Sequence, residues 1–256
     1  MSFAKSETVA KLLFTLTPFI CLAGIVILQA QEYKKSVRQL DSADYLAQEQ
    51  EQASLVNWQK QSSHFGFDNL QADISYLNFL QYFGDKAARE TIGYKLVPNY
   101  FATISSIDPH FTQAHLNLAI ANSMYAGNPE QTIEFMEQIL ESVDPKSEQA
   151  AYLWTSKGLD ELLFMGDKSA AIQSYNMAAN WADLTISDRP NQIAIKDLEL
   201  ALGYTDEIDL KKAQIFAWSS VLVHIKDYQR RREILDKISN LKAEILTLEQ
   251  AALDAS

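Results

Sequence analysis

Histidine and cysteine are the residue types in this chain best suited to metal binding. The four histidines are His64, His110, His115 and His224. A helical zinc site places two histidines three or four residues apart, on one face, whereas His110 and His115 are five residues apart. The single cysteine, Cys21, lies in an apolar stretch near the N-terminus, which excludes disulfides and cysteine catalysis in the rest of the chain. We therefore expect no metal site and no cofactor.

Paired carboxylates are the next residues that could do chemistry, as general acid and base. Asp160 and Glu161 are adjacent, and so are Asp206 and Glu207. Neighbours in a helix point about 100° apart, so neither pair converges on one bond of a substrate. The chain also has no glycine-rich phosphate loop, no Gly-x-Ser-x-Gly motif and no recognisable pairing of a nucleophile with a base. The sequence predicts no catalytic residue, no enzymatic activity and no small-molecule substrate.

The densest positive cluster consists of Arg230, Arg231 and Arg232. One interpretation is a contact for lipid headgroups or for an acidic partner. The other is a solvated face whose arginines pair with acidic residues of the same predicted helix, namely Asp227, Glu233 and Asp236. The whole chain carries a net charge of -11 and has no basic region large enough to neutralise a run of phosphates, which excludes nucleic acid as a partner.

The elements that would position these residues begin with an uncharged apolar segment over residues 12–30. At ~1.5 Å per residue, a helix over this segment covers about the thickness of a bilayer's hydrocarbon core, and a spanning helix tolerates Pro18 as a kink. A cleaved signal peptide is disfavoured because a cut after Ala30 would put Leu28 where a small residue is needed. A lipoprotein signal is disfavoured because Ile20 precedes the cysteine. We predict a single transmembrane helix.

Positive residues flank both ends of this segment, so the positive-inside rule gives little direction: Lys5 and Lys11 before it, and Lys34, Lys35 and Arg38 after it. A short tail with two lysines and a free amine usually stays in the cytoplasm, and long acidic domains cross a membrane largely regardless of their charge. We therefore expect the soluble domain on the extracytoplasmic side.

The rest of the chain is poor in helix-breaking residues. Only 8 Gly and 6 Pro occur among 256 residues, which favours an all-α fold. We predict a short tail over 1–11, the transmembrane helix over 12–30, a helical stalk over 31–65, a helical repeat domain over 66–240 and a capping helix over 241–256. Small and turn-forming residues near 62–66 mark the end of the stalk.

Three glycine-containing turns divide the predicted repeat domain. Residues 83–88 (FGDKAA) return as 165–171 (MGDKSAA), and 126–129 (AGNP) lie between them. The turn glycines Gly84, Gly127 and Gly166 are 43 and 39 residues apart, as expected for helix pairs of the 34-residue type that carry short inserts. Apolar residues at helical spacing lie on both sides of each turn, so we predict that each turn joins two helices.

The third helix pair resembles the tetratricopeptide signature, in which the first helix carries an aromatic residue and a glycine and the second carries alanine, an aromatic residue and alanine. The residues that carry the resemblance are Trp154, Gly158, Gly166, Ala171, Tyr175 and Ala178. One extra residue lies between Gly158 and Gly166, and the preceding pair has Thr132 and Met136 in place of alanine and an aromatic residue. The resemblance implies a tetratricopeptide-like α-solenoid, a stack of helix pairs with a concave groove for peptides or helices.

Longer stretches resemble a group of uncharacterised, membrane-anchored, tetratricopeptide-like proteins of cyanobacteria. The stretches are 76–85, 157–164 and 213–218, and the resemblance covers residues 70–240. It implies the fold and a photosynthetic organism, in which the extracytoplasmic side would be the thylakoid lumen or the periplasm. It implies no known activity.

The last predicted helix has apolar residues at steps of four and three, the spacing of a coiled coil: Ile234, Ile238, Leu241, Ile245, Leu248 and Ala252. The pattern lasts under three heptads. It fits a helix that caps the last repeat, and it also fits a helix that pairs with a partner.

Together these patterns predict a membrane-anchored interaction scaffold or assembly factor for a membrane complex, whose partners are other proteins of that complex. The candidate groove residues lie on the first helices of the pairs: Asn117, Lys157, Asp160 and Glu161. For each of them, ordinary solvent exposure or hydrogen bonding between repeats is the alternative interpretation. The alternative function is a stoichiometric accessory subunit of a larger membrane complex.

Overall fold

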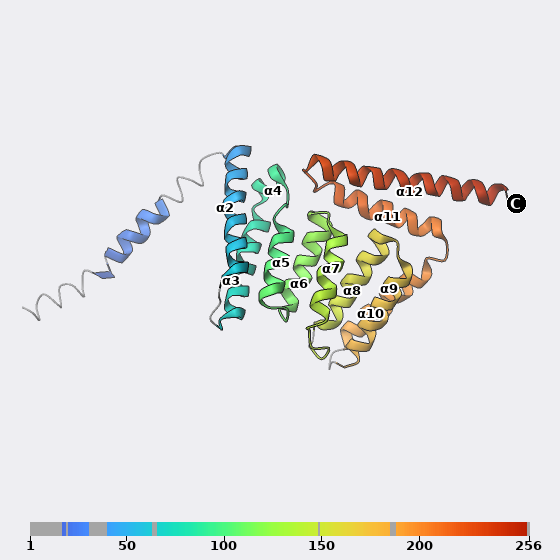
Figure 1. The fold of residues 1–256 in the computed structure, drawn as a ribbon, viewed down its shortest axis with the longest axis horizontal. Helices are drawn as coiled ribbons and strands as arrows, with labels where there is room; N and C mark the ends of the chain where they lie inside the picture. The colour runs from blue at the N-terminus through green and yellow to red at the C-terminus, as the bar shows by residue number, and fades with distance from the viewer. Residues whose placement is uncertain are drawn as a thin grey trace, which may run out of the picture. The chain divides into compact units, whose positions relative to one another are not determined.

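The computed structural model describes residues 17–18, 20–30, 40–62, 66–147, 149–184 and 188–254, and every regular element within these ranges is a helix. The prediction of an all-α chain is therefore confirmed for the described residues (Figure 1). The chain divides into two compact units, residues 1–44 and residues 45–256.

In the first unit, residues 20–30 are helical, and their large apolar side chains, such as Ile25 and Leu28, are exposed. Residues 12–16 and 19 of the predicted transmembrane helix lie outside the described residues, as do the predicted tail over 1–11 and residues 31–39 of the predicted stalk. Where the structure describes the chain, no helix has both the length and the apolar character that crossing a membrane requires. The transmembrane helix stays a prediction.

The second unit contains nearly all of α2 (Ser42–Gln61), which packs against α3 (Asp68–Gly84). Val56 of α2 is buried in the same apolar cluster as Tyr82 of α3, and the Tyr82 hydroxyl donates a hydrogen bond of 2.9 Å to Glu49. From Tyr45 onward the predicted stalk thus belongs to the compact unit. The sequence concealed this packing because α2 uses buried polar residues, Glu49 and Gln59, beside few apolar ones.

A short helix, α4 (Lys86–Ile92), is inserted between α3 and α5 (Val97–Ile107). Asp85 caps α4 by accepting a hydrogen bond of 3.1 Å from the backbone N–H of Ala88. The chain then turns at Gly93, and α5 packs against α3 with Phe101 and Ile104 fully buried. This insertion explains why the first turn-to-turn interval is longer than the second.

Two helix pairs of similar construction follow. The second pair of the chain consists of α6 (Thr112–Ile120), the π-helical turn η1 (Ala121–Tyr125) and α7 (Pro129–Leu140). The third pair consists of α8 (Ala150–Asp160), η2 (Glu161–Met165) and α9 (Lys168–Ala182). Each π-helical turn leads to a glycine in the left-handed region, Gly127 with φ 73° and Gly166 with φ 71°. Glycine adopts this backbone without the steric cost that other residues meet. The predicted turns at these two glycines do join two helices.

After α10 (Asp188–Gly203), the chain folds back as a hairpin of α11 (Glu207–Leu222) and α12 (Tyr228–Asp254), which lies across the ends of the helix pairs in Figure 1. A Cβ built on Gly166 would lie 2.6 Å from Gln214, and one built on Gly127 would lie 2.7 Å from Ile225. The hairpin therefore covers the turns of both pairs.

The predicted boundary at residue 240 falls within α12, which is one continuous helix. No glycine or proline interrupts the sequence between its ends, so nothing in the chain would break the helix there. Ile234 and Ile238 of the predicted heptad are buried in a cluster with Trp218 and Val221 of α11. At least the first half of the heptad face thus packs within this chain.

Candidate functional site

A buried polar network joins the second and third helix pairs. Lys157, Asp160 and Glu161 are all buried: Lys157 forms an ion pair with Glu161 and a second one, of 3.4 Å, with Glu137 of α7. Glu161 also accepts a hydrogen bond of 2.6 Å from the Ser174 hydroxyl of α9. Opposite charges that are paired and hydrogen-bonded in this way can be accommodated in an interior.

Asp160 lies beside this pair and connects α8 to the preceding pair. Its carboxylate accepts a hydrogen bond of 2.5 Å from the Ser123 hydroxyl of η1. Burial raises the pKa of Asp160 to about 7, an effect that the Ser123 hydrogen bond opposes and the nearby carboxylates of Glu161 and Glu130 reinforce. The network therefore ties three consecutive helices together and contains a carboxyl group that titrates near neutral pH.

These positions bear on the predicted groove residues. Lys157, Asp160 and Glu161 are interior residues that bond one helix to the next, which matches the alternative interpretation given above. Asn117 is half-buried, and its side-chain amide donates a hydrogen bond to the Tyr76 hydroxyl of α3. All of them hold neighbouring helices in place, and none projects freely from the surface.

The arginine cluster is divided between two roles. Arg230 is partly buried and donates a hydrogen bond of 2.8 Å from Nε to the backbone carbonyl of Gly127, and it pairs with Glu130 and Glu233 at 3.1 Å each. Arg231 is exposed and donates to the Leu222 carbonyl at 3.0 Å, and Arg232 is exposed. Arg230 thus fastens α12 to the turn of the second pair, a contact that the cluster's composition did not indicate.

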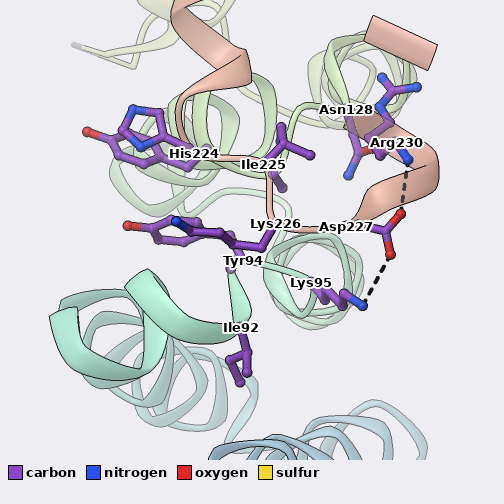
Figure 2. A pocket seen from close by; sticks show the side chains of 12 residues that line it. Ile92, Tyr94, Lys95, Asn128, His224, Ile225, Lys226, Asp227 and Arg230 are labelled. Carbon is purple, nitrogen blue, oxygen red and sulfur yellow. Dashed lines mark hydrogen bonds and ion pairs between the residues drawn. The ribbon is translucent and has the colours of Figure 1, made fainter. Parts of the chain in front are cut away.

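An open cavity of about 230 Å³ lies beside Arg230, where the Gly93 turn, the end of η1 and the α11–α12 connection meet (Figure 2). Asp227 stands between two partners there, with an ion pair of 3.2 Å to Lys95 and a hydrogen bond of 2.9 Å from the backbone N–H of Arg230. His224 lies against the ring of Tyr125 with 4.4 Å between ring centroids, and burial, followed by the charge of Lys226, lowers its pKa. Polar and aromatic side chains of the hairpin and of the helix pairs thus line the cavity together.

The other histidines that the structure describes, His110 and His115, do not assemble a site. His64 lies outside the described residues, and His110 is exposed. His115 is buried, its Nε2 is 3.0 Å from the Asp108 carbonyl, and burial lowers its pKa to about 4. Among the described residues, no group of three histidine, cysteine or acidic side chains lies close enough together to hold a metal ion.

The first helices of the three pairs, α3, α6 and α8, share a row of exposed apolar residues. Residues at equivalent positions are 43 residues apart between α3 and α6 and 39 residues apart between α6 and α8, the same intervals that separate the turn glycines. Equivalent positions on these helices then form rows across them. Leu77, Ile120 and Leu159 make one such row, with 57%, 55% and 41% of each residue exposed. Neighbouring first helices are in contact, because Asn117 bonds to Tyr76 and Ser123 bonds to Asp160.

Three further rows lie beside this one, and we call the four rows together the first-helix face. They consist of Leu70, Gln113 and Tyr152; Ile74, Asn117 and Ser156; and Gln81, Met124 and Leu163. No residue of the first-helix face is buried, and none is charged. Asn117 bonds to Tyr76, and Met124 and Leu163 pack against the cluster around Trp218, so the accessible part of the face is formed mainly by its other residues. In a chain of which 21% is charged, four rows without charge on the first helices of three successive pairs are unusual.

Other helices of the repeat domain carry charged residues. The second helix α7 carries Glu130, Glu134 and Glu137, and α10 exposes Lys196 and Glu199. The first helices also carry charged residues, such as the exposed Asp73 of α3, so the neutral character belongs to the four rows and not to the whole helices. These rows could have been found in the sequence by comparing residues 43 and 39 positions apart, the intervals between the turn glycines. The two intervals differ because α4 is inserted after the first turn, so the equivalent positions are not evenly spaced and are hard to recognise.

Comparison with protein families, curated proteins and solved structures finds no match to this chain.

Proposed function

We propose that this chain is a membrane-tethered, tetratricopeptide-like scaffold that binds a partner protein through the first-helix face. The observation that carries the proposal is the row of Leu77, Ile120 and Leu159, exposed at equivalent positions of the first helices of three successive pairs. Exposed apolar side chains are normal when scattered, but a contiguous set surrounded by polar residues is typical of an interaction site. The proposal assigns the chain no catalytic role and no cofactor.

The tetratricopeptide-like solenoid is part of this proposal. In favour of it, helices pack mainly on their neighbours in sequence, and the signature residues Ala171, Tyr175 and Ala178 of α9 are buried. Ala171 and Tyr175 belong to a cluster with Leu162 of η2 and Ala201 of α10. Gly158 lies directly against the Tyr175 ring, since a Cβ there would be 2.7 Å from it. A small residue on the first helix facing an aromatic residue on the second is what the resemblance implies.

The membrane tether is the second part of the proposal. It is supported by the uncharged segment over 12–30 and by the exposed apolar side chains of the helical residues 20–30. A tether raises the effective concentration of a partner in the same membrane, so a modest interface suffices. Burial of each exposed leucine or isoleucine is worth at most ~1.5–3 kcal/mol before the costs of association, which suits a weak contact that the tether strengthens.

We further propose that the domain faces the thylakoid lumen or the periplasm and that the protein assists assembly of a membrane complex. A stoichiometric accessory subunit of such a complex is the alternative function. Stoichiometry separates the two, because an accessory subunit would remain in constant ratio to the mature complex, whereas an assembly factor would accompany only immature forms. Protease treatment of sealed vesicles tests the predicted side.

The experiment that tests the proposal is affinity purification of the full chain from detergent-solubilised membranes of its own cells, with partners identified by mass spectrometry. Ile120→Glu places a charge in the centre of the exposed row and should remove the partner. Phe216→Glu is the matched control, because Phe216 of α11 is 75% exposed but lies outside the first-helix face. Unchanged recovery of the partner with Ile120→Glu, with helical circular dichroism intact, would contradict the proposal.

A further inference from the structure

We infer that Asp160 is a proton-controlled link between the second and third helix pairs. With a protonated carboxyl group, Asp160 completes a chain of hydrogen bonds that runs from α8 through η1 to the start of α7. With an ionised carboxylate, that chain is one proton short and the link between the two pairs loosens. This response to pH is a property of the folded domain and requires neither the membrane tether nor the first-helix face.

The chain of hydrogen bonds contains three contacts between oxygen atoms. The Ser123 hydroxyl of η1 lies 2.5 Å from the Asp160 carboxyl group and 2.9 Å from the Thr132 hydroxyl of α7. The Thr132 hydroxyl in turn lies 3.0 Å from the backbone carbonyl oxygen of Asn128. Because Asp160, Ser123 and Thr132 are all buried, the protons for these contacts come from the side chains themselves.

Counting these protons distinguishes the two charge states of Asp160. Each hydroxyl has one proton to donate and a carbonyl oxygen has none, so Ser123 and Thr132 supply two protons for three contacts. The side-chain amide of Asn122 also donates to Thr132, at 3.0 Å, but that bond is additional to the three.

A protonated Asp160 supplies the missing proton. It donates to Ser123, which then donates to Thr132, and the Thr132 hydroxyl remains free to donate to the Asn128 carbonyl. An ionised Asp160 can only accept, so one of the three buried contacts would join two oxygen atoms with no proton between them. A buried polar contact that lacks its proton destabilises the arrangement that contains it.

The charges nearest Asp160 also favour its neutral form. Asp160 forms no ion pair with a lysine or arginine of the described residues. Burial raises its pKa to about 7, the carboxylates of Glu161 and Glu130 raise it further, and the hydrogen bond from Ser123 opposes them. Tyr175 of α9, which also lies near Asp160, is neutral at this pH because burial raises the pKa of its hydroxyl.

The other charged or titratable groups on the helices packed around α8 and η2 are engaged elsewhere. Lys157 of α8 pairs with Glu161 and with Glu137 of α7. The remaining groups and their partners are Arg230 and Lys237 of α12 with Glu130, His115 of α6 with the Asp108 carbonyl, Lys211 of α11 with Glu207 and Glu244, and Asp197 of α10 near the Tyr175 hydroxyl.

The link belongs to one boundary of the stack. At the intervals of 39 and 43 residues, the positions equivalent to Asp160 hold Ala121 in the second pair and Asn78 in the first. Neither residue has a carboxyl group, so the packing of one pair on the next does not itself require a carboxyl group at this position. Asp160 therefore gives the boundary between the second and third pairs a dependence on pH that is specific to it.

The direction of the response follows from proton binding in the closed and opened states. In an opened state the solvated carboxyl group of Asp160 would have its ordinary pKa of 3.8, whereas in the closed state its pKa is about 7. The opened state therefore binds fewer protons between these pH values, and opening becomes easier as pH rises. Between pH 6 and pH 8 the equilibrium constant for opening should rise about tenfold and then level off.

Hydrogen–deuterium exchange of the full chain in detergent, measured at pH 6 and pH 8 and corrected for intrinsic exchange rates, tests the link. We expect the corrected exchange to be about tenfold faster at pH 8 in η2 and at the start of α7, with no change in α3, which is remote from the link. Asp160→Asn cannot ionise and presents an amide donor at every pH, so it should abolish the response in both segments.

Ser123→Ala separates the link from the effect of burial alone. The variant keeps Asp160 buried but breaks the chain, and the Thr132 proton then suffices for the Asn128 carbonyl. The response should therefore persist in η2 and disappear at the start of α7. If this variant loses its helical circular dichroism, Thr132→Val replaces it, because the Ser123 proton is then left for Asp160 alone and the response of α7 should again disappear.

Three results would overturn the link. The first is an unchanged chain in which the start of α7 does not respond to pH. The second is a response of α7 that survives Ser123→Ala or Thr132→Val, since it would not pass through the hydroxyls. The third is an equal response in α3, which would show that Asp160 acts on unfolding of the whole domain and not on one boundary.

Discussion

Replacement of Gly158 by alanine tests the closest contact between a first and a second helix in this fold. Gly158 lies in the last turn of α8, which continues into η2, and a Cβ there would be 2.7 Å from Cε1 and 2.9 Å from Cδ1 of Tyr175. Tyr175 is fully buried on α9, and its ring is rigid, so the contact cannot be relieved by rotation of a flexible chain end. Either the ring or the spacing of the two helices must change.

Two opposing terms set the size of the effect. Helix propensity favours alanine over glycine by about 1 kcal/mol in a helix interior. Overpacking of a well-filled core by one methyl group costs about 1–3 kcal/mol, and the contact here is short enough to put Gly158→Ala in the upper half of that range. We expect net destabilisation of about 1–2 kcal/mol, which lowers the melting temperature of a domain of this size by roughly 2–8 °C.

Chemical denaturation with urea provides the assay, and the chain offers a matched control. Gly203, at the end of α10, has no atom within 4 Å of a built Cβ, so Gly203→Ala should be neutral or slightly stabilising. The preceding pair supplies a rescue, because Ala119 and Met136 occupy the positions equivalent to Gly158 and Tyr175. A double variant, Gly158→Ala with Tyr175→Met, should lose less stability than the sum of the single changes. If Gly158→Ala stabilises the chain as Gly203→Ala does, the packing argument is refuted.

Other contacts yield further predictions. Burial raises the pKa of Asp160 from 3.8 to about 7, so the native state is stabilised by the protonated carboxyl group and loses that stability as pH rises from about 4 to 7. Asparagine cannot ionise, so the free energy of unfolding of Asp160→Asn, measured with urea, should be higher relative to the unchanged chain at pH 8 than at pH 5. The pKa of His115 is lowered from 6.5 to about 4, so native stability from this group should rise between those pH values, and His115→Gln should remove the rise in an acid titration of unfolding. Arg230→Ala should cost about 1.5–3 kcal/mol and speed hydrogen exchange in α11 and α12, whereas Arg232→Ala, at an exposed position, should change stability by less than about 0.5 kcal/mol. Gly127→Ala should destabilise by about 2 kcal/mol in the same urea assay, because φ is 73° and the new Cβ would meet Ile225.

Local patterns in the sequence predicted the local structure well. The helical spacing of apolar residues and the turn glycines correctly predicted α6 to α9. A glycine turn and an apolar stripe are both recognisable from residues close together in the sequence. The fold-back of α11 and α12 was not predicted, since Gly127 and Arg230, which meet there, are far apart in sequence and carry no mark of their contact. The same limit explains why Lys157 and Glu161 were assigned to a groove. Charged residues are rarely buried, and only the folded positions of α7 and α9 show that Glu137 pairs with Lys157 and that Ser174 bonds to Glu161.

The fold-back also connects the turns to the first-helix face. The hairpin of α11 and α12 lies over the Gly127 and Gly166 turns, so it fixes how the second and third pairs sit against each other and thereby the interval between Ile120 and Leu159. A substitution of Arg230, which bonds the hairpin to the Gly127 turn, should therefore alter partner binding although Arg230 is not part of the first-helix face. Arg230→Ala should weaken recovery of the partner less than Ile120→Glu does but more than Arg232→Ala, because a loosened stack presents the row at a variable spacing. Equal recovery with both arginine variants would show that the helix pairs keep their spacing without the hairpin, and that the first-helix face is set by contacts such as Ser123 to Asp160 alone.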